Sequence, residues 1–173
     1  MIQIKFPVLL LLLMVLLCSG CILENRQKSN LGEITQITYS SSSGSILPDL
    51  QWHEEIIITL DEVTLTRNGK TPDSMVNSGT WRCQIDPSIT ETLFIQIKDV
   101  ECSIINRIES KDSPDGGSVE NYIIHYQNGT TCDLFYDPGT EYLNGEMIVN
   151  PILEYMKLID FPQDSVAQYK DIP

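Results

Sequence analysis

The sequence predicts an α+β domain, a curved antiparallel sheet of about six strands with two helices packed against it. Segments in which apolar and polar residues alternate recur along the chain, which is typical of strands with one buried face. The dipeptide Asn128-Gly129 lies between two such segments and is the strongest two-residue signal for a hairpin turn. Two further segments carry apolar residues at helical spacing. The expected order is strand, hairpin, strand, helix, strand, hairpin, helix, which favours an α+β domain.

The first part of the domain is expected to consist of strands. A strand at 34–39 is followed by a serine-rich loop at 40–48. Residues 55–67 form a hairpin in which Leu60 pairs with Val63. That pairing places five apolar residues on one face and threonines on the other, the pattern of a sheet with one side buried. The five residues are Ile56, Ile58, Leu60, Val63 and Leu65.

The middle of the domain is predicted to contain a strand, a helix and another strand. A short strand at 79–84 precedes Asp86-Pro87, which supplies an N-cap and a first-turn proline for a helix. A strand at 103–108 and a loop at 110–118 come next. The apolar residues at helical spacing are Ile89, Leu93, Ile97 and Val100.

The second hairpin is predicted from 119–127 and 130–136, on either side of Asn128-Gly129. A two-residue turn at this dipeptide fixes a register in which His125 lies opposite Cys132. Both faces of the hairpin carry large apolar side chains. We therefore expect it to lie inside the sheet, with a helix over one side.

The end of the domain is predicted to be a turn and a closing helix. Asp137 to Thr140 turns the chain, and Asn150-Pro151 begins the helix, which ends before Pro162. The apolar stripe of this helix consists of Ile152, Tyr155, Met156 and Ile159. The tail, 163–173, is polar and is expected to be loose.

The first 21 residues have the layout of a secretory signal. Lys5 precedes an apolar run from Phe6 to Leu17, and small residues lead directly to a cysteine. The segment Leu17-Cys18-Ser19-Gly20-Cys21 resembles the lipobox of prokaryotic lipoproteins, bacterial or archaeal. It departs from that pattern at the position three before the cleavage site, where leucine is usual and Cys18 stands here.

The resemblance implies that residues 1–20 are removed and that the sulfur of Cys21 carries a lipid with several chains, palmitate among them. Such a protein is anchored to the cell membrane on its extracytoplasmic face. The expected organisation is a signal peptide at 1–20, a lipidated cysteine and flexible spacer at 21–32, one domain at 33–162, and the tail. The order of elements over 34–159, with the Asn-Gly hairpin, also resembles that of small uncharacterised prokaryotic lipoprotein domains.

An uncleaved transmembrane helix is the alternative for this segment. Phe6 to Leu23 spans eighteen residues, at the lower end of the length that crosses a bilayer. Arg26 and Lys28 would keep the following flank on the cytoplasmic side. The Ser-Gly-Cys sequence favours lipidation, because a plain anchor helix does not require it.

The composition indicates an acidic folded domain of 153 residues after residue 20. Ten basic residues then stand against 24 acidic ones, a formal net charge of −14, which repels phosphate backbones and argues against nucleic acid as a partner. Three cysteines remain besides Cys21, namely Cys83, Cys102 and Cys132. An odd number allows either one disulfide with one thiol or three thiols.

Three constellations could carry chemistry or modification. The expected pair of Cys132 and His125 could be a buried thiol beside an imidazole, a nucleophile with its base, or two zinc ligands completed by Cys83 or Cys102. A loop group could bind calcium through carboxylate oxygens, although it lacks the EF-hand spacing. Its residues are Asp112, Asp115 and Glu120. Asn128-Gly129-Thr130 is a glycosylation sequon as well as a turn.

Other catalytic templates are missing from the sequence. His53 begins a zinc-protease-like motif, but Ile57 occupies the position of the second ligand. No nucleophile elbow and no serine three residues before a lysine occur. We therefore predict a non-catalytic binding or interaction module of the cell envelope without a cofactor, whose partner is an envelope protein or a small ligand. The alternative is a small tethered thiol enzyme or hydrolase that uses Cys132 and His125.

Overall fold

The computed structural model describes residues 31–112 and 114–162. The predicted signal peptide, Cys21, most of the spacer and the tail at 163–173 lie outside these residues. None of the helices within the described residues has the length and hydrophobicity of a membrane span.

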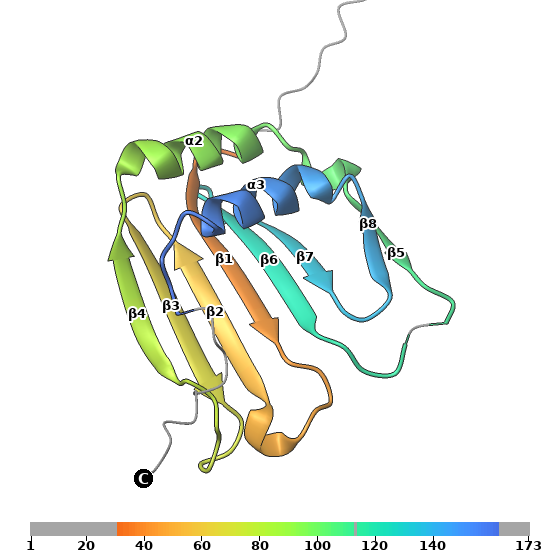
Figure 1. The fold of residues 1–173 in the computed structure, drawn as a ribbon. Helices are drawn as coiled ribbons and strands as arrows, with labels where there is room; N and C mark the ends of the chain where they lie inside the picture. The colour runs from red at the N-terminus through yellow and green to blue at the C-terminus, as the bar shows by residue number, and fades with distance from the viewer. Residues whose placement is uncertain (1–30, 113, 163–173) are drawn as a thin grey trace, which may run out of the picture.

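The described residues form a six-stranded antiparallel sheet with two helices on one face, and a second sheet of two strands (Figure 1). The strand order in the large sheet is β4-β3-β2-β1-β6-β7, and β5 pairs with β8 in the small one. The predicted α+β fold is therefore confirmed. The strands are β1 Ile34–Ser42, β2 Trp52–Ile58, β3 Glu62–Gly69, β4 Gly79–Gln84, β5 Asn106–Glu109, β6 Val119–Tyr126, β7 Thr131–Tyr136 and β8 Thr140–Leu143. The helices are α2 Pro87–Lys98 and α3 Glu146–Met156, with short 3₁₀ turns η1 Pro48–Leu50 and η2 Cys102–Ile104.

The hydrophobic core lies between the helices and one face of the large sheet. Ile37 at the centre of that face pairs with Ile58 of β2 and with Ile124 of β6, and all three are fully buried. Because side chains alternate between the two faces of a strand, this register turns every second residue of the central strands toward the helices. From the helices the most deeply buried apolar residues are Leu93, Ile97, Ile148 and Ile152.

Helix α2 begins as the sequence predicted. The Asp86 side chain accepts a hydrogen bond from the Ser88 backbone N–H at 3.0 Å, which satisfies one of the free donors at the helix start. The same interaction lowers the pKa of Asp86 below its ordinary value. Leu93 and Ile97 are buried as expected, whereas Ile89 is 40% exposed.

Helix α3 begins one turn before the predicted start. Gly145 is its N-cap, and Pro151 lies inside the helix rather than at its first position. A proline there removes one hydrogen bond of the helix. The apolar stripe explains why the helix tolerates it, because Ile148 is fully buried together with Ile152 and extends the predicted stripe toward the N-terminus.

Strand β1 is longer than predicted. Residues 40–42, expected in a serine-rich loop, continue the strand and pair with β2 on one side and β6 on the other. Ser41 is only 4% exposed. Serine has little preference for strands, so the two neighbouring strands determine the conformation here.

The strand expected at 103–108 is also displaced. Its first part forms the 3₁₀ turn η2, and strand β5 runs from Asn106 to Glu109. Its partner β8 was not predicted, because four residues directly after a turn carry little periodicity.

The first hairpin has the predicted faces but a different register. Ile58 pairs with Val63, so the turn consists of Leu60 and Asp61. Leu60 is 48% exposed rather than part of the buried face. The observed pairing differs from the predicted one by two residues. Because side chains alternate with a period of two, the other apolar residues of the hairpin stay on the predicted face.

The second hairpin differs from the prediction by one residue. Ile124 pairs with Cys132, and His125 pairs with Thr131. The chain makes a three-residue loop: the Gly129 N–H donates to Tyr126 O at 2.9 Å, and the Tyr126 N–H donates to the Thr130 carbonyl oxygen at 3.0 Å. Gly129 has a φ of 83° and so occupies the left-handed conformation that typically ends a three-residue hairpin loop.

The position of this hairpin in the sheet was partly anticipated. Strand β6 lies inside the sheet between β1 and β7, but β7 forms an edge. The helices cover one face, as predicted (Figure 1). At the turn, the Asn128 side chain accepts hydrogen bonds from the backbone and the hydroxyl of Thr130, at 3.0 and 2.7 Å.

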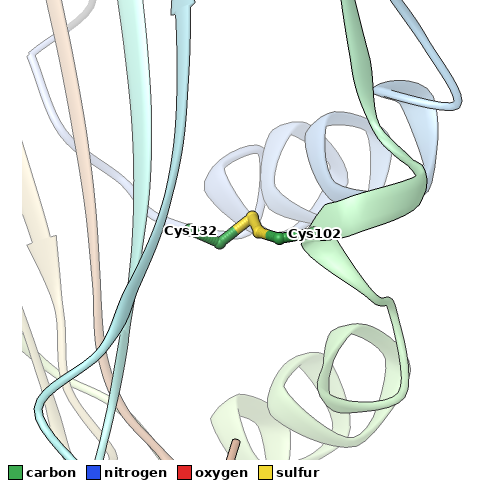
Figure 2. Close-up of a disulfide and its surroundings, with 2 residues drawn as sticks. All are labelled: Cys102 and Cys132. Carbon is green, nitrogen blue, oxygen red and sulfur yellow. A yellow bond between two sulfur atoms is a disulfide. The ribbon is translucent and has the colours of Figure 1, made fainter. Parts of the chain in front are cut away.

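A disulfide joins Cys102 of η2 to Cys132 of β7, with the two Cα atoms 5.8 Å apart (Figure 2). Cys83 is the free cysteine of the described residues. Of the two arrangements left open by the odd cysteine count, the structure therefore has one disulfide and one thiol.

Candidate functional site

The predicted pair of Cys132 and His125 does not form. The one-residue register shift places Cys132 on the core face, where it is bonded to Cys102. His125 lies on the opposite face, and its Nε2 is 3.1 Å from the hydroxyl oxygen of Thr38. The predictions of a thiol–imidazole pair and of a zinc site at these two residues are therefore wrong, because the two side chains point to opposite faces of the sheet.

The calcium group also finds no support in the geometry. Within 31–112 and 114–162, no three histidine, cysteine, aspartate or glutamate side chains lie close enough together to hold a metal ion. Glu120, one of the three predicted ligands, instead lies in a cleft at the other end of the loop.

This cleft has a volume of about 360 Å³ and lies on the core side of the large sheet, beside α3. Its floor comes from β6 and β7, and its walls come from the β8 region and α3. The volume is at the lower end of the range for small-molecule sites. The lining residues are Glu120, Tyr122, Tyr136, Thr140, Glu141, Tyr142, Glu146, Val149, Asn150 and Leu153.

A chain of four tyrosines extends from the middle of the sheet to this cleft. The ring centroids of Tyr39 and Tyr122 are 5.0 Å apart, because these residues are direct partners across β1 and β6. Tyr122 meets Tyr136 edge to face at 5.8 Å, and Tyr136 meets Tyr142 at 4.9 Å. Aromatic pairs at these separations stabilise one another, so these contacts hold the rings of the cleft floor together.

Tyr142 ties the small sheet to the edge of the large one. Its hydroxyl group accepts a hydrogen bond from the Phe135 backbone N–H at 3.1 Å and donates one to the Phe135 carbonyl oxygen at 3.3 Å. Strand β7 has no further strand beyond it in the large sheet, so this pair of bonds satisfies part of its free edge.

Gly145 allows α3 to approach these rings. A Cβ atom at this position would lie 2.5 Å from the Tyr136 hydroxyl oxygen and 2.7 Å from the Tyr142 Cβ. Any larger residue would therefore displace a tyrosine or the helix start. This requirement could not be seen in the sequence, since Gly145 lies six residues before Pro151, between the predicted turn and the predicted helix, where no element was expected.

The electrostatics of the cleft are negative. Three glutamates line it, at positions 120, 141 and 146, and none of the described lysines, arginines or histidines does. The Tyr122 hydroxyl donates to Glu120 Oε2 at 2.8 Å. Burial raises the pKa of Tyr136, and the negative charges of Glu146 and Glu120 add to that increase. Burial likewise raises the pKa of Tyr39 and of Tyr122, so these two hydroxyl groups and that of Tyr136 keep their protons at neutral pH.

A second groove of about 290 Å³ lies at the opposite end of the sheet from α2, around Trp52. It contains a serine–histidine contact, with Ser42 Oγ 2.8 Å from His53 Nδ1. No carboxylate lines this groove to orient the imidazole, as a catalytic triad requires. The cleft is therefore the better candidate.

Apart from Glu120, which was considered as a calcium ligand, the cleft residues were not identified from the sequence as a site. Five of the seven tyrosines fall between residues 122 and 155, a concentration that could have marked the region. Their convergence depends on β8 and the early start of α3, neither of which was predicted. Comparison of the chain with protein-family models, with curated proteins and with solved structures finds no match.

Proposed function

We propose that this chain is an exported, lipid-anchored binding module of the cell envelope, and that its domain binds a small ligand in the cleft between β6, β7, β8 and α3. The observation that carries the binding role is the cleft itself. It combines a ligand-sized volume with packed aromatic side chains and a few polar groups, the composition of small-molecule sites.

The disulfide supports the exported location. Disulfides persist in oxidising compartments and are rare in the cytosol. The bond between Cys102 and Cys132 is in keeping with the signal-like segment at 1–20 and with an anchor at Cys21.

A non-catalytic role is favoured over the thiol enzyme. Cys132 is half of a disulfide and so has no thiolate to act as a nucleophile. Within the described part of the chain, neither cysteine nor histidine, the side chains that the alternative required, lines the cleft.

The anchor can be tested with the full-length chain expressed with its own N-terminus. Intact-mass analysis should find residues 1–20 removed and a lipid on Cys21. In a detergent solution warmed until it separates into two phases, the protein should enter the detergent-rich phase. Cys21→Ala should lack the lipid in its intact mass, and once residues 1–20 are also absent it should move to the aqueous phase. Cys83→Ala is the matched control and should stay with detergent. A mass that retains residues 1–20, or a bare sulfur at Cys21, contradicts the anchor.

The binding role can be tested by a thermal-shift screen of small metabolites against the wild type and Tyr136→Ala. A compound that raises the midpoint of the wild type but not of the variant supports the cleft as the site. Compounds that stabilise both proteins equally, or none that stabilises the wild type, argue against it.

A further inference from the structure

Resting on the proposed function, we propose that the cleft binds a small organic cation, an ammonium group that carries hydrocarbon substituents. The inference concerns the chemical class of the ligand of that same cleft. Four features of the cleft support it: the sign of its charge, the spread of its carboxylates, its aromatic rings and its apolar wall.

Charge is the first argument. Glu120, Glu141 and Glu146 all line the cleft without a basic neighbour in the lining. Among the described residues none of the three takes part in an ion pair, because the pairs that form involve other acids. Three carboxylates around a partly enclosed space attract a cation, and the net charge of −13 adds to that attraction at long range.

The spacing of the carboxylates separates an organic cation from a metal ion. A metal site needs several hard ligands within about 2.5 Å of one point. The three glutamates do not form such a group within the described part of the chain. An ammonium group with substituents is large enough to interact with carboxylates that are set further apart.

The rings and the apolar wall specify the rest of the ligand. Tyr136 and Tyr142 are partly exposed at the cleft, and tyrosine rings attract cations within about 6 Å of the ring centroid. Val149 and Leu153 of α3 supply hydrocarbon contacts on the wall. A weakly hydrated alkylammonium ion can contact both the tyrosine rings and the apolar wall. A strongly hydrated inorganic cation keeps its water shell and contacts neither. The volume of about 360 Å³ limits the ligand to a small molecule.

The test is calorimetric titration of the full-length, detergent-solubilised protein with matched probes. Choline represents quaternary ammonium ions, putrescine represents primary ones, and 3,3-dimethylbutan-1-ol is the uncharged isostere of choline. At low salt we expect choline or putrescine to bind at least tenfold more tightly than the neutral alcohol. The tighter of the two identifies the kind of ammonium group. Comparable affinity for the alcohol, tighter binding of calcium than of either amine, or no binding of either amine overturns the inference.

Variants distinguish local charge from overall charge. Glu146→Gln and Glu141→Gln should each weaken binding of the preferred amine by five- to tenfold. Glu91→Gln removes the same charge from an exposed site on α2, outside the cleft lining, and should change the affinity by less than twofold. If Glu91→Gln and the cleft variants lose the same amount of affinity, net charge alone attracts the amine, and the proposal that it binds in the cleft is wrong. Unchanged thermal midpoints confirm that each variant is folded.

The outcome for the ligand class is separable from the outcome for the proposed function. If neither amine binds but another compound stabilises the wild type and not Tyr136→Ala, the cation inference fails and the binding role stands. If no compound of any class acts through the cleft, the binding role fails as well. The lipid anchor is measured independently of both.

Discussion

At the scale of single residues, the structure depends on a few buried polar contacts that join elements distant in sequence. Thr90 of α2 and Tyr155 of α3 are both buried, and their hydroxyl oxygens are 2.7 Å apart. Tyr155 was expected in the apolar stripe of its helix. Its hydrogen-bond partner was not, because nothing local indicates which residue of a different helix a buried hydroxyl will meet.

We expect Thr90→Val to lower the free energy of unfolding by about 1–3 kcal/mol, because it leaves the buried Tyr155 hydroxyl without this partner. Tyr155→Phe should have a similar effect for the reciprocal reason. The double variant should be less destabilised than the two single effects added together. Urea unfolding of the four proteins measures this coupling. Strict additivity would show that the two hydroxyl groups do not depend on each other.

The buried tyrosines also make stability depend on pH in the alkaline range. Burial raises the pKa of Tyr39 from 10.0 to about 12 and that of Tyr122 in the same direction. Because the folded state holds these protons more tightly, the stabilisation is complete below pH 10 and is lost as the pH rises through the folded-state pKa. The acidic side of the profile is not affected by these two groups.

Between pH 10 and 12 we therefore expect the free energy of unfolding to fall, with each such tyrosine contributing up to about 1.4 kcal/mol per pH unit. Tyr39→Phe should make the decline shallower over that interval. Lysines titrate in both proteins and cancel in the comparison. An identical slope for the variant and the wild type would contradict the assigned pKa increase.

At the scale of elements, the two hairpins show what a turn motif decides. For the first, alternation alone set the faces, and a two-residue error in register left them unchanged. For the second, Asn128-Gly129 was taken as a two-residue turn, whereas the chain adds Gln127 to form a three-residue loop. An error of one residue moves a side chain to the other face, which is why the pairing of His125 with Cys132 was wrong.

The conformation of Gly129 provides a test of this loop. No atom lies within 4 Å of a Cβ placed there, so a substitution meets no steric obstacle, but the φ of 83° disfavours other residues. We expect Gly129→Ala to destabilise the protein by about 1–2 kcal/mol and Gly129→Asn by less, since asparagine tolerates the left-handed region. Chemical unfolding of both variants provides the measurement. A loss below about 0.3 kcal/mol in Gly129→Ala would argue for a different turn.

At the scale of the whole molecule, one covalent bond joins the segment after α2 to the edge strand of the sheet. The Cys102–Cys132 disulfide closes a loop with a sequence separation of 30 residues, and Cys132 is 2% exposed. This loop contains β5 and most of the second hairpin. The bond therefore restricts the unfolded chain between residues 102 and 132, a segment that contains Glu120 and Tyr122 of the cleft.

We expect reduction of this disulfide to lower the free energy of unfolding by about 3–4 kcal/mol, the loop entropy for its length. The Cys102→Ala/Cys132→Ala variant should start at the lower value and not respond to reductant. Cys83→Ala should keep the response of the wild type. Alkylation under denaturing, non-reducing conditions should leave Cys102 unlabelled. Labelling of Cys102, or insensitivity of the wild type to reductant, contradicts the bond.

The fold class, the central strands and the start of α2 could be predicted from the order of the amino acids alone. Each of these depends on interactions within a few residues: side-chain alternation, an N-cap, or a glycine in a turn. Tertiary structure decided the extension of β1 through its serines, strand β8, the early start of α3, the register of the second hairpin and the cysteine pairing. The cleft belongs to this second group, because its tyrosines and glutamates come from β6, β7, the β8 region and α3, and meet only when those elements pack together.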